Sequence, residues 1–325
     1  MMSRGTLSQV ISADVRALYD WASQDQSSQL WGTELYSEYS PDVPDEQLSA
    51  MTGPGKGTLT VEGQQYAANQ IYKDYPVTVT LRKFTSELAY TEEDLHWIQK
   101  QTSSKRLSNF KSMIVNHVQA LYANHNDELA KHLYLGFGTT NFTGGDAVAL
   151  FSGSHPIRAT GSTQSNMFSS THLPLTSDNL VTAIDVMNRF QNANGIELRP
   201  VRRLRVVVSK ENESVANQIL NSLYGPLNAN LGINKGSAEA LRARGMDISV
   251  VCLPDIPYAY RNYWFLIDLD RSAERLQKAV AWNPRMAQDT RTQNGTFYND
   301  ASTLFGIFSL GWQHVFGSKG DSSAV

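Results

Sequence analysis

Residues 104–135 read SKRLSNFKSMIVNHVQALYANHNDELAKHLYL, and Gly136 follows them. Apolar residues recur at steps of three and four, the period of one helix face. They are Leu107, Phe110, Ile114, Val118, Leu121, Leu129 and Leu133. Ser103 or Ser104 can cap the first turn, and Gly136 is predicted to end the helix in the left-handed conformation. At 1.5 Å per residue the helix extends about 48 Å, so we expect a spine of the fold rather than a pocket wall.

The bulk composition is that of an ordinary globular protein. The chain has 325 residues, of which 41% are hydrophobic and 18% charged, with a formal net charge of −3. This predicts a sizeable core in about two domains, and it argues against a dedicated DNA-binding protein, which needs a basic face. The single cysteine excludes an intrachain disulfide. No signal peptide or membrane span is visible, so we expect synthesis in the cytoplasm and no membrane partner.

The segments that precede the spine helix are too poor in apolar residues for a core of their own. The amino-terminal segment carries aromatic anchors at Trp31, Tyr36 and Tyr39 without a clear period, which favours an extended arm that docks on another surface. From Gln47 to Tyr75 the sequence is polar and rich in turns, and it is predicted to be a long hairpin-like loop. Alternating apolar residues over 75–81 then predict a strand with one buried face.

After the spine helix comes a glycine-rich loop and then a mixed unit of sheet and helices. Helices are predicted at 178–191 and 214–223, and strands at 204–208, 248–253 and 263–267. The carboxy-terminal part, 276–316, is rich in strand patterns. The elements together indicate an α+β protein.

No residue constellation typical of an enzyme stands out. Ser154 and His155 raise the alternative of a Ser/His hydrolase, but adjacent side chains in an extended chain point apart, and no G-x-S-x-G elbow surrounds them. The glycines of 53–58 do not form a phosphate-binding loop, because glycine follows the lysine where Ser or Thr is required. Cys252 lies in an apolar run and is expected to be an inert core thiol. No catalytic residue and no cofactor site is therefore predicted.

Histidines and arginines form two further groups that could be functional sites. His117, His125 and His132 share the spine helix at spacings of eight and seven, too far apart for neighbouring metal ligands, so no metal site is predicted. The densest basic cluster consists of Arg199, Arg202, Arg203 and Arg205. No aromatic residues interleave with these arginines, which favours interface salt bridges or a solvated face over DNA contact.

The order of these parts resembles the major capsid proteins of tailed bacteriophages, in particular the Mu-like major head subunit family. The stretches that carry the resemblance are VTVTLRKFTSELAYTEEDL at 77–95, LFSGSHP at 150–156, LRVVVS at 204–209, YWFLID at 263–268, and Gly311-Trp312. They are spread over nearly the whole chain, and it is their order and spacing that is specific.

The resemblance implies the Hong Kong 97-type fold, an α+β architecture with a spine helix, a peripheral domain, an axial domain, an extended loop and an amino-terminal arm. The implied boundaries are 1–47 for the arm, 48–76 for the extended loop, 77–160 for the peripheral domain with the spine helix at 104–135, 161–269 for the axial domain, and 270–325 for return strands of the peripheral domain. No covalent cross-link between subunits is expected, because no motif identifies an acceptor for a loop lysine.

The implied function is a non-enzymatic one: self-assembly into the pentamers and hexamers of an icosahedral shell around double-stranded DNA. The implied partners are other copies of the chain, the packaged DNA by non-specific contact, a portal protein, a separate scaffold protein, and a cement protein. The implied location is the virion, after assembly in the host cytoplasm. An encapsulin-like nanocompartment that packages a cargo enzyme is the alternative within the same fold, and the Ser/His hydrolase is the alternative outside it.

The residues expected at the assembly interface come from the arm, the loop and the arginine cluster. They are Trp31, Tyr36, Tyr39, Lys56, Tyr66, Arg199, Arg202, Arg203 and Arg205. Arms and loops without their own core become stable by lying on a neighbour, and obligate interfaces of this kind commonly bury about 2,000 Å² or more.

Overall fold

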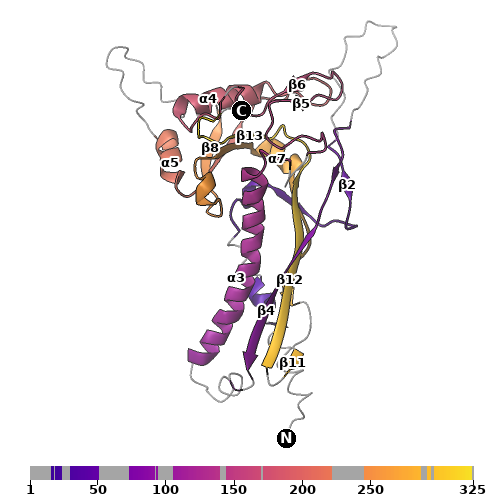
Figure 1. The fold of residues 1–325 in the computed structure, drawn as a ribbon, viewed down its shortest axis with the longest axis vertical. Helices are drawn as coiled ribbons and strands as arrows, with labels where there is room; N and C mark the ends of the chain where they lie inside the picture. The colour runs from indigo at the N-terminus through magenta and orange to yellow at the C-terminus, as the bar shows by residue number, and fades with distance from the viewer. Residues whose placement is uncertain are drawn as a thin grey trace.

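The structure is a computed structural model of the 325-residue chain. It describes residues 16–17, 19–23, 30–50, 73–91, 93, 105–139, 144–169, 171–221, 245–286, 291–293 and 296–323. A long helix lies along a sheet of long strands, and a second, smaller sheet with its own helices sits at the carboxy-terminal end of that helix (Figure 1). In the part of the chain that these ranges cover, no helix is both long enough and apolar enough to cross a membrane.

The long helix is α3, Lys105–Tyr134, which confirms the helix predicted at 104–135. The described part of its apolar stripe is buried as expected; Ile114, Val118 and Leu133 are examples with almost no exposed surface. The side chains of Leu107 and Phe110 lie outside the described part. The predicted left-handed conformation of Gly136 is wrong, since this residue does not have a positive φ. Glycine is needed there for space, because a Cβ would lie 2.9 Å from the carbonyl oxygen of His132 and 3.1 Å from the Phe151 ring.

The long sheet supports α3 along much of its length. Within the described residues its strands, in order, are β1 (Ser37–Tyr39), β10 (Leu276–Met286), β12 (Thr296–Ser309) and β11 (Arg291–Gln293), and β4 (Arg82–Thr91) also pairs with β12. β10, β11 and β4 run antiparallel to β12, whereas β1 runs parallel to β10. The strand-rich carboxy-terminal part is thus confirmed.

The strand predicted over 75–81 is shorter than expected. Val77 and Val79 are buried, as the alternation requires, but only β3 (Val77–Thr78) is a strand. β3 pairs with β2 (Gln47–Leu48), and the chain starts its long strand afterwards, at Arg82. Between the two strands the carbonyl oxygen of Thr80 passes so close to Gly306 that a Cβ there would lie 2.3 Å away.

The smaller sheet has the order β13-β9-β7-β8. Its strands are β7 (Arg203–Val208), β8 (Asp247–Cys252), β9 (Trp264–Asp268) and β13 (Val315–Ser318), and its helices are α4 (Ser177–Asn188) and α5 (Glu213–Asn221). The predicted elements of this unit are all present, with ends shifted by up to three residues. β7 and β8 are parallel, and β9 is antiparallel to both β7 and β13. Short elements elsewhere are η2 (Thr33–Leu35), η3 (Tyr258–Tyr260), β5 (His155–Pro156) and β6 (Thr163–Gln164).

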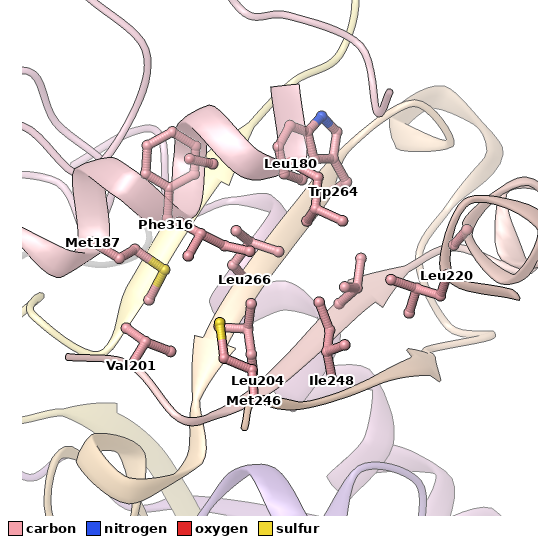
Figure 2. Packing of buried hydrophobic residues seen from close by; sticks show 14 of the residues in the cluster. Leu180, Met187, Val201, Leu204, Leu220, Met246, Ile248, Trp264, Leu266 and Phe316 are labelled. Carbon is pink, nitrogen blue, oxygen red and sulfur yellow. The ribbon is translucent and has the colours of Figure 1, made fainter. Parts of the chain in front are cut away.

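Side chains on the two faces of the smaller sheet belong to different cores. Leu204 and Leu266 face α4 and α5 and pack with Leu180, Met187 and other apolar residues (Figure 2). Alternate residues of the same strands, such as Val207 and Phe265, turn to the opposite face. There they join the last turns of α3, including Leu133. The end of the long helix is therefore fixed by the smaller sheet, which ties the two units together.

Helix α7 (Leu269–Arg275) connects the two sheets, because β9 enters it and β10 leaves it. Asp268 caps its first turn by accepting a hydrogen bond from the amide of Asp270, as polar residues commonly do at helix N-termini. The position of α7 makes it the joint between the smaller sheet and the long one.

Candidate assembly interface

The amino-terminal arm docks on its own chain over the residues that the structure describes. Tyr36 is buried in the core around the end of α3, and Tyr39 meets Phe308 of β12 edge to ring at 6.0 Å. Trp31 differs, because 53% of its surface is exposed. Of the three predicted aromatic anchors, Tyr36 and Tyr39 thus contribute to the fold of the subunit. Trp31 is the most exposed of the three and leaves the most surface for a partner.

A buried lysine explains why the arm runs beside β10. Lys278 is only 1% exposed, and its Nζ lies 2.7 Å from Glu38 Oε1 and 5.2 Å from the ring centre of Tyr36. Burial lowers the pKa of Lys278, and the hydrogen bond and charge of Glu38 oppose that shift. Ser37 adds a hydrogen bond from its hydroxyl to the Ala273 carbonyl at 2.6 Å. Sequence reasoning missed this contact, since nothing in the local pattern of β10 marks Lys278 as buried.

The arginine cluster divides into one structural residue and three exposed ones. Arg205 is buried, with Nε 2.9 Å from Glu34 and Nη1 3.2 Å from Asp247, so it holds η2 and β8 to β7. Arg199 and Arg202 are exposed. Arg203 is also exposed, and it pairs with the exposed Asp270 at 3.3 Å.

Position along β7, rather than the strand period, separates the exposed Arg203 from the buried Arg205. Residues 203, 205 and 207 share one face of the strand, and within that set Arg205 occupies the interior position beside the buried Val207. The cluster therefore presents Arg199, Arg202 and Arg203 to solvent.

The base of the predicted loop is a hairpin-like junction. Gln47 pairs with Thr78, and the amide of Asp74 donates to the Ala50 carbonyl at 2.8 Å. The chain therefore leaves and returns at neighbouring positions, as a long loop requires. Lys56 and Tyr66 lie outside the described residues.

An ion pair that sequence reasoning missed fixes this base. Asp74, Arg275 and Gln313 are all buried. Arg275 Nη1 is 3.3 Å from Asp74 Oδ2, 2.6 Å from Gln313 Oε1 and 3.0 Å from the Leu310 carbonyl oxygen. No sequence spacing could reveal it, because the partners come from the loop end, α7 and the turn after β12.

The environment of His155 gives no support to a hydrolase site. Its Nδ1 lies 2.7 Å from Asp146 Oδ2, and its Nε2 lies 3.2 Å from Asn166 Oδ1. The ring stacks on Trp312 with centroids 4.6 Å apart. Each ring nitrogen therefore faces a side-chain oxygen, of Asp146 or of Asn166. Ser154, the preceding residue in the chain, is exposed. The small cavity at this place, about 10 Å³, has room for roughly one water molecule rather than a substrate.

Cys252 is only partly buried, so its expected place in the core is corrected. Burial, together with the nearby Glu213 carboxylate, raises the pKa of the Cys252 thiol to about 11. The thiol form therefore persists at neutral pH, as expected for an unreactive cysteine. Among the described residues, no three His, Cys, Asp or Glu side chains gather as metal ligands would.

Structural comparison identifies the fold. The chain superposes on a chain from the capsid of the cyanophage P-SCSP1u with a TM-score of 0.51 at 12% sequence identity, covering 87% of this chain and 85% of that one. It also superposes on a chain from the mature capsid of bacteriophage PhiM1 with a TM-score of 0.50 at 11% identity, covering 89% and 86%. No family model and no curated protein sequence matches the chain. The shared feature is thus an α+β fold found in phage capsids.

Proposed function

We propose that this chain is the major capsid protein of a tailed bacteriophage, and that it assembles into the pentamers and hexamers of an icosahedral shell around double-stranded DNA. The observation that carries the proposal is the fold, which two phage capsid chains share over most of their length. The finer assignment, to the Mu-like major head subunits with a Hong Kong 97-type fold, rests on the sequence stretches that carry that resemblance.

The two sheets support a division into the parts of a shell subunit. We assign residues 77–160 and 270–325, with α3 and the long sheet, to the peripheral domain, and 161–269, with the smaller sheet, to the axial domain. Residues 1–47 are the arm and 48–76 the extended loop. In this arrangement α3 stiffens the wall, and its end is held by the axial domain through the core that contains Leu133 and Val207.

The exposed groups supply surfaces for contacts between subunits. Ring formation requires two different, complementary patches on each copy, because the contacts are head to tail. The exposed Arg199, Arg202 and Arg203 form one candidate patch, and Trp31 forms another. Many modest contacts repeated around a shell then supply the stability that a single tight site supplies elsewhere.

The two alternatives to a phage head, a hydrolase and a nanocompartment, call for different arguments. A Ser/His hydrolase is disfavoured by the geometry of His155, because both of its ring nitrogens contact side-chain oxygens, of Asp146 and Asn166. A nanocompartment that packages a cargo enzyme would use the same kind of subunit, so the contents of the particle must separate it from a phage head. Portal, scaffold and cement proteins are further proposed partners of a phage head.

The test is to isolate particles of this protein from the cells that naturally produce it, treat them with nuclease, and open them. The proposal predicts double-stranded DNA protected inside, with no enzyme in stoichiometric amount. Particles that contain a folded cargo protein and no protected DNA would contradict the phage-head assignment and favour the nanocompartment.

A further inference from the structure

Three buried histidines line the contact between α3 and the end of the long sheet. His125 Nε2 lies 3.0 Å from Thr303 Oγ1, and the His125 ring stacks on Phe305 with centroids 3.8 Å apart. One heptad further along α3, His132 Nε2 lies 2.8 Å from Ser309 Oγ. His314, in the turn between β12 and β13, approaches the same hydroxyl group at 3.4 Å. His125 and His132 thus each place a ring nitrogen within hydrogen-bond distance of a hydroxyl group of β12.

These rings are placed to be neutral. Thr303 and Ser309 are hydroxyl partners, which bond a neutral imidazole without stabilising a positive charge. The Nδ1 atoms of His125 and His314 are buried and have no hydrogen-bond partner in the described part of the chain. A second proton on the His125 or the His314 ring would therefore be buried without a hydrogen-bond acceptor, which costs free energy.

The charged groups around the rings also disfavour protonation. Lys278 disfavours a positive charge on His125, and Arg275, His132 and Arg271 disfavour one on His314. The carboxylates of this region are already engaged in ion pairs. The ion pairs are Lys278 with Glu38, Arg275 with Asp74, Arg271 with Asp268, and, on α3 itself, Lys131 with Asp127 and with Glu128. Glu128 also pairs with Arg82.

The pKa values follow from this environment. Burial, assisted by Lys278, lowers the pKa of His125 to about 2. Burial lowers the pKa of His132 to about 3, and burial with the charge of Arg275 holds the pKa of His314 well below its usual range. A histidine exposed by opening of the contact would return to about 6.5.

We propose that the contact between α3 and β12 is an acid-responsive latch, in which neutral histidines hold the helix on the sheet and their protonation favours a state with the helix released. The closed contact binds fewer protons than the open one, so it is fully stable above about pH 6.5 and loses stability as the pH falls below that value. The proposal concerns a contact within one chain, and it does not depend on the capsid assignment.

The size of the effect follows from the difference in protonation. A histidine that stays neutral in the closed state and titrates normally in the open state increases the opening equilibrium about 100-fold at pH 4.5 relative to pH 7.5. His125 and His132 together give about 10⁴-fold, which is enough to convert a rare local opening into a common one.

Hydrogen exchange of the whole protein, measured at pH 7.5 and 4.5 and corrected for intrinsic rates, tests the latch. At pH 4.5 we expect a large gain in exchange in α3 while the core strands β7 and β9 stay protected. In His125→Gln/His132→Gln that gain should fall by about 10⁴-fold, since glutamine keeps a donor for Thr303 and Ser309 but does not titrate. His172→Gln, which replaces a buried histidine away from this contact, is the matched control and should behave as the unaltered protein does.

Three results would overturn the proposal: unchanged protection of α3 at pH 4.5, an equal rise in β7 and β9, or the same rise in the double variant. If the double variant fails to fold, NMR of labelled histidines in the unaltered protein decides. The latch predicts that His125 and His132 remain neutral until α3 opens. Titration of either ring near pH 6.5 with α3 still protected would refute it.

Discussion

Arg275 and Asp74 form a buried ion pair, 3.3 Å between Nη1 and Oδ2, that joins the helix between the two sheets to the residue at which the loop returns. Gln313 contacts both side chains, at 2.6 Å from Arg275 and 3.5 Å from Asp74. The same Gln313 offers its carbonyl oxygen to Arg271, which also bonds the Met187 carbonyl at the end of α4. The loop base is thereby connected to the smaller sheet through α7.

Removal of one partner from this pair should be strongly destabilising. Arg275→Met leaves the Asp74 carboxylate buried without its cation, so we expect the free energy of unfolding to fall by about 3–5 kcal/mol. Urea unfolding of the unassembled protein measures it. Asp74→Leu/Arg275→Met, which removes both charges, should recover most of the loss, whereas a double variant as unstable as Arg275→Met would contradict this view of the pair.

Gly306 should not tolerate a side chain. The backbone at Thr80 crosses β12 at this glycine, so Gly306→Ala forces the segment between β3 and β4 away from β12, and we expect a loss of about 1–3 kcal/mol in urea unfolding. Gly138→Ala is the matched control, because a Cβ there meets no atom closer than 3.9 Å. If both variants were equally stable, the close crossing of Thr80 over β12 would be wrong.

The exposed arginines should act in assembly rather than in folding. Arg202→Glu/Arg203→Glu is expected to reduce the yield of particles by at least about tenfold, while the melting temperature of the unassembled protein changes by little, because surface ion pairs contribute about 0–1 kcal/mol. Arg202→Lys/Arg203→Lys keeps the charge and should retain assembly. An unchanged particle yield in the glutamate variant would remove these residues from the interface.

The loop should be dispensable for folding and required for assembly. Ala50 and Asp74 are hydrogen-bonded neighbours, so a short Gly-Ser linker can replace residues 52–72 without strain. We expect the shortened protein to keep its circular dichroism spectrum and cooperative unfolding, yet to form no shells in size-exclusion chromatography. Normal particles from this variant would contradict the role assigned to the loop.

Periodicity predicted the elements that bury an apolar face. α3 and β7 are of this kind, since each has a continuous stripe or run of buried residues. β4 (Arg82–Thr91) was not predicted, although Phe84, Leu88 and Tyr90 alternate with exposed residues along it. Ser86 interrupts this apolar series, and backbone pairing to β12 holds the strand. β1 is likewise held by backbone pairing, to β10, and its Glu38 bonds Lys278.

Contacts between distant residues were beyond sequence reasoning for a different reason. Asp74 and Arg275 lie 201 residues apart, and neither belongs to a motif. The helix spacing of His125 and His132 led us to expect no metal site on α3, but the spacing could not tell that β12 supplies a hydroxyl partner for each ring. Arg205 was grouped with its exposed neighbours because its partners, Glu34 and Asp247, come from other elements.

Negative-stain electron microscopy of the purified protein, over a range of protein and salt concentrations, tests the central claim most directly. The capsid assignment predicts closed shells of uniform size, accompanied by rings of five or six subunits where assembly is incomplete. A preparation that remains monomeric under all of these conditions, with its fold intact by circular dichroism, would contradict the assignment of this chain as a self-assembling shell subunit.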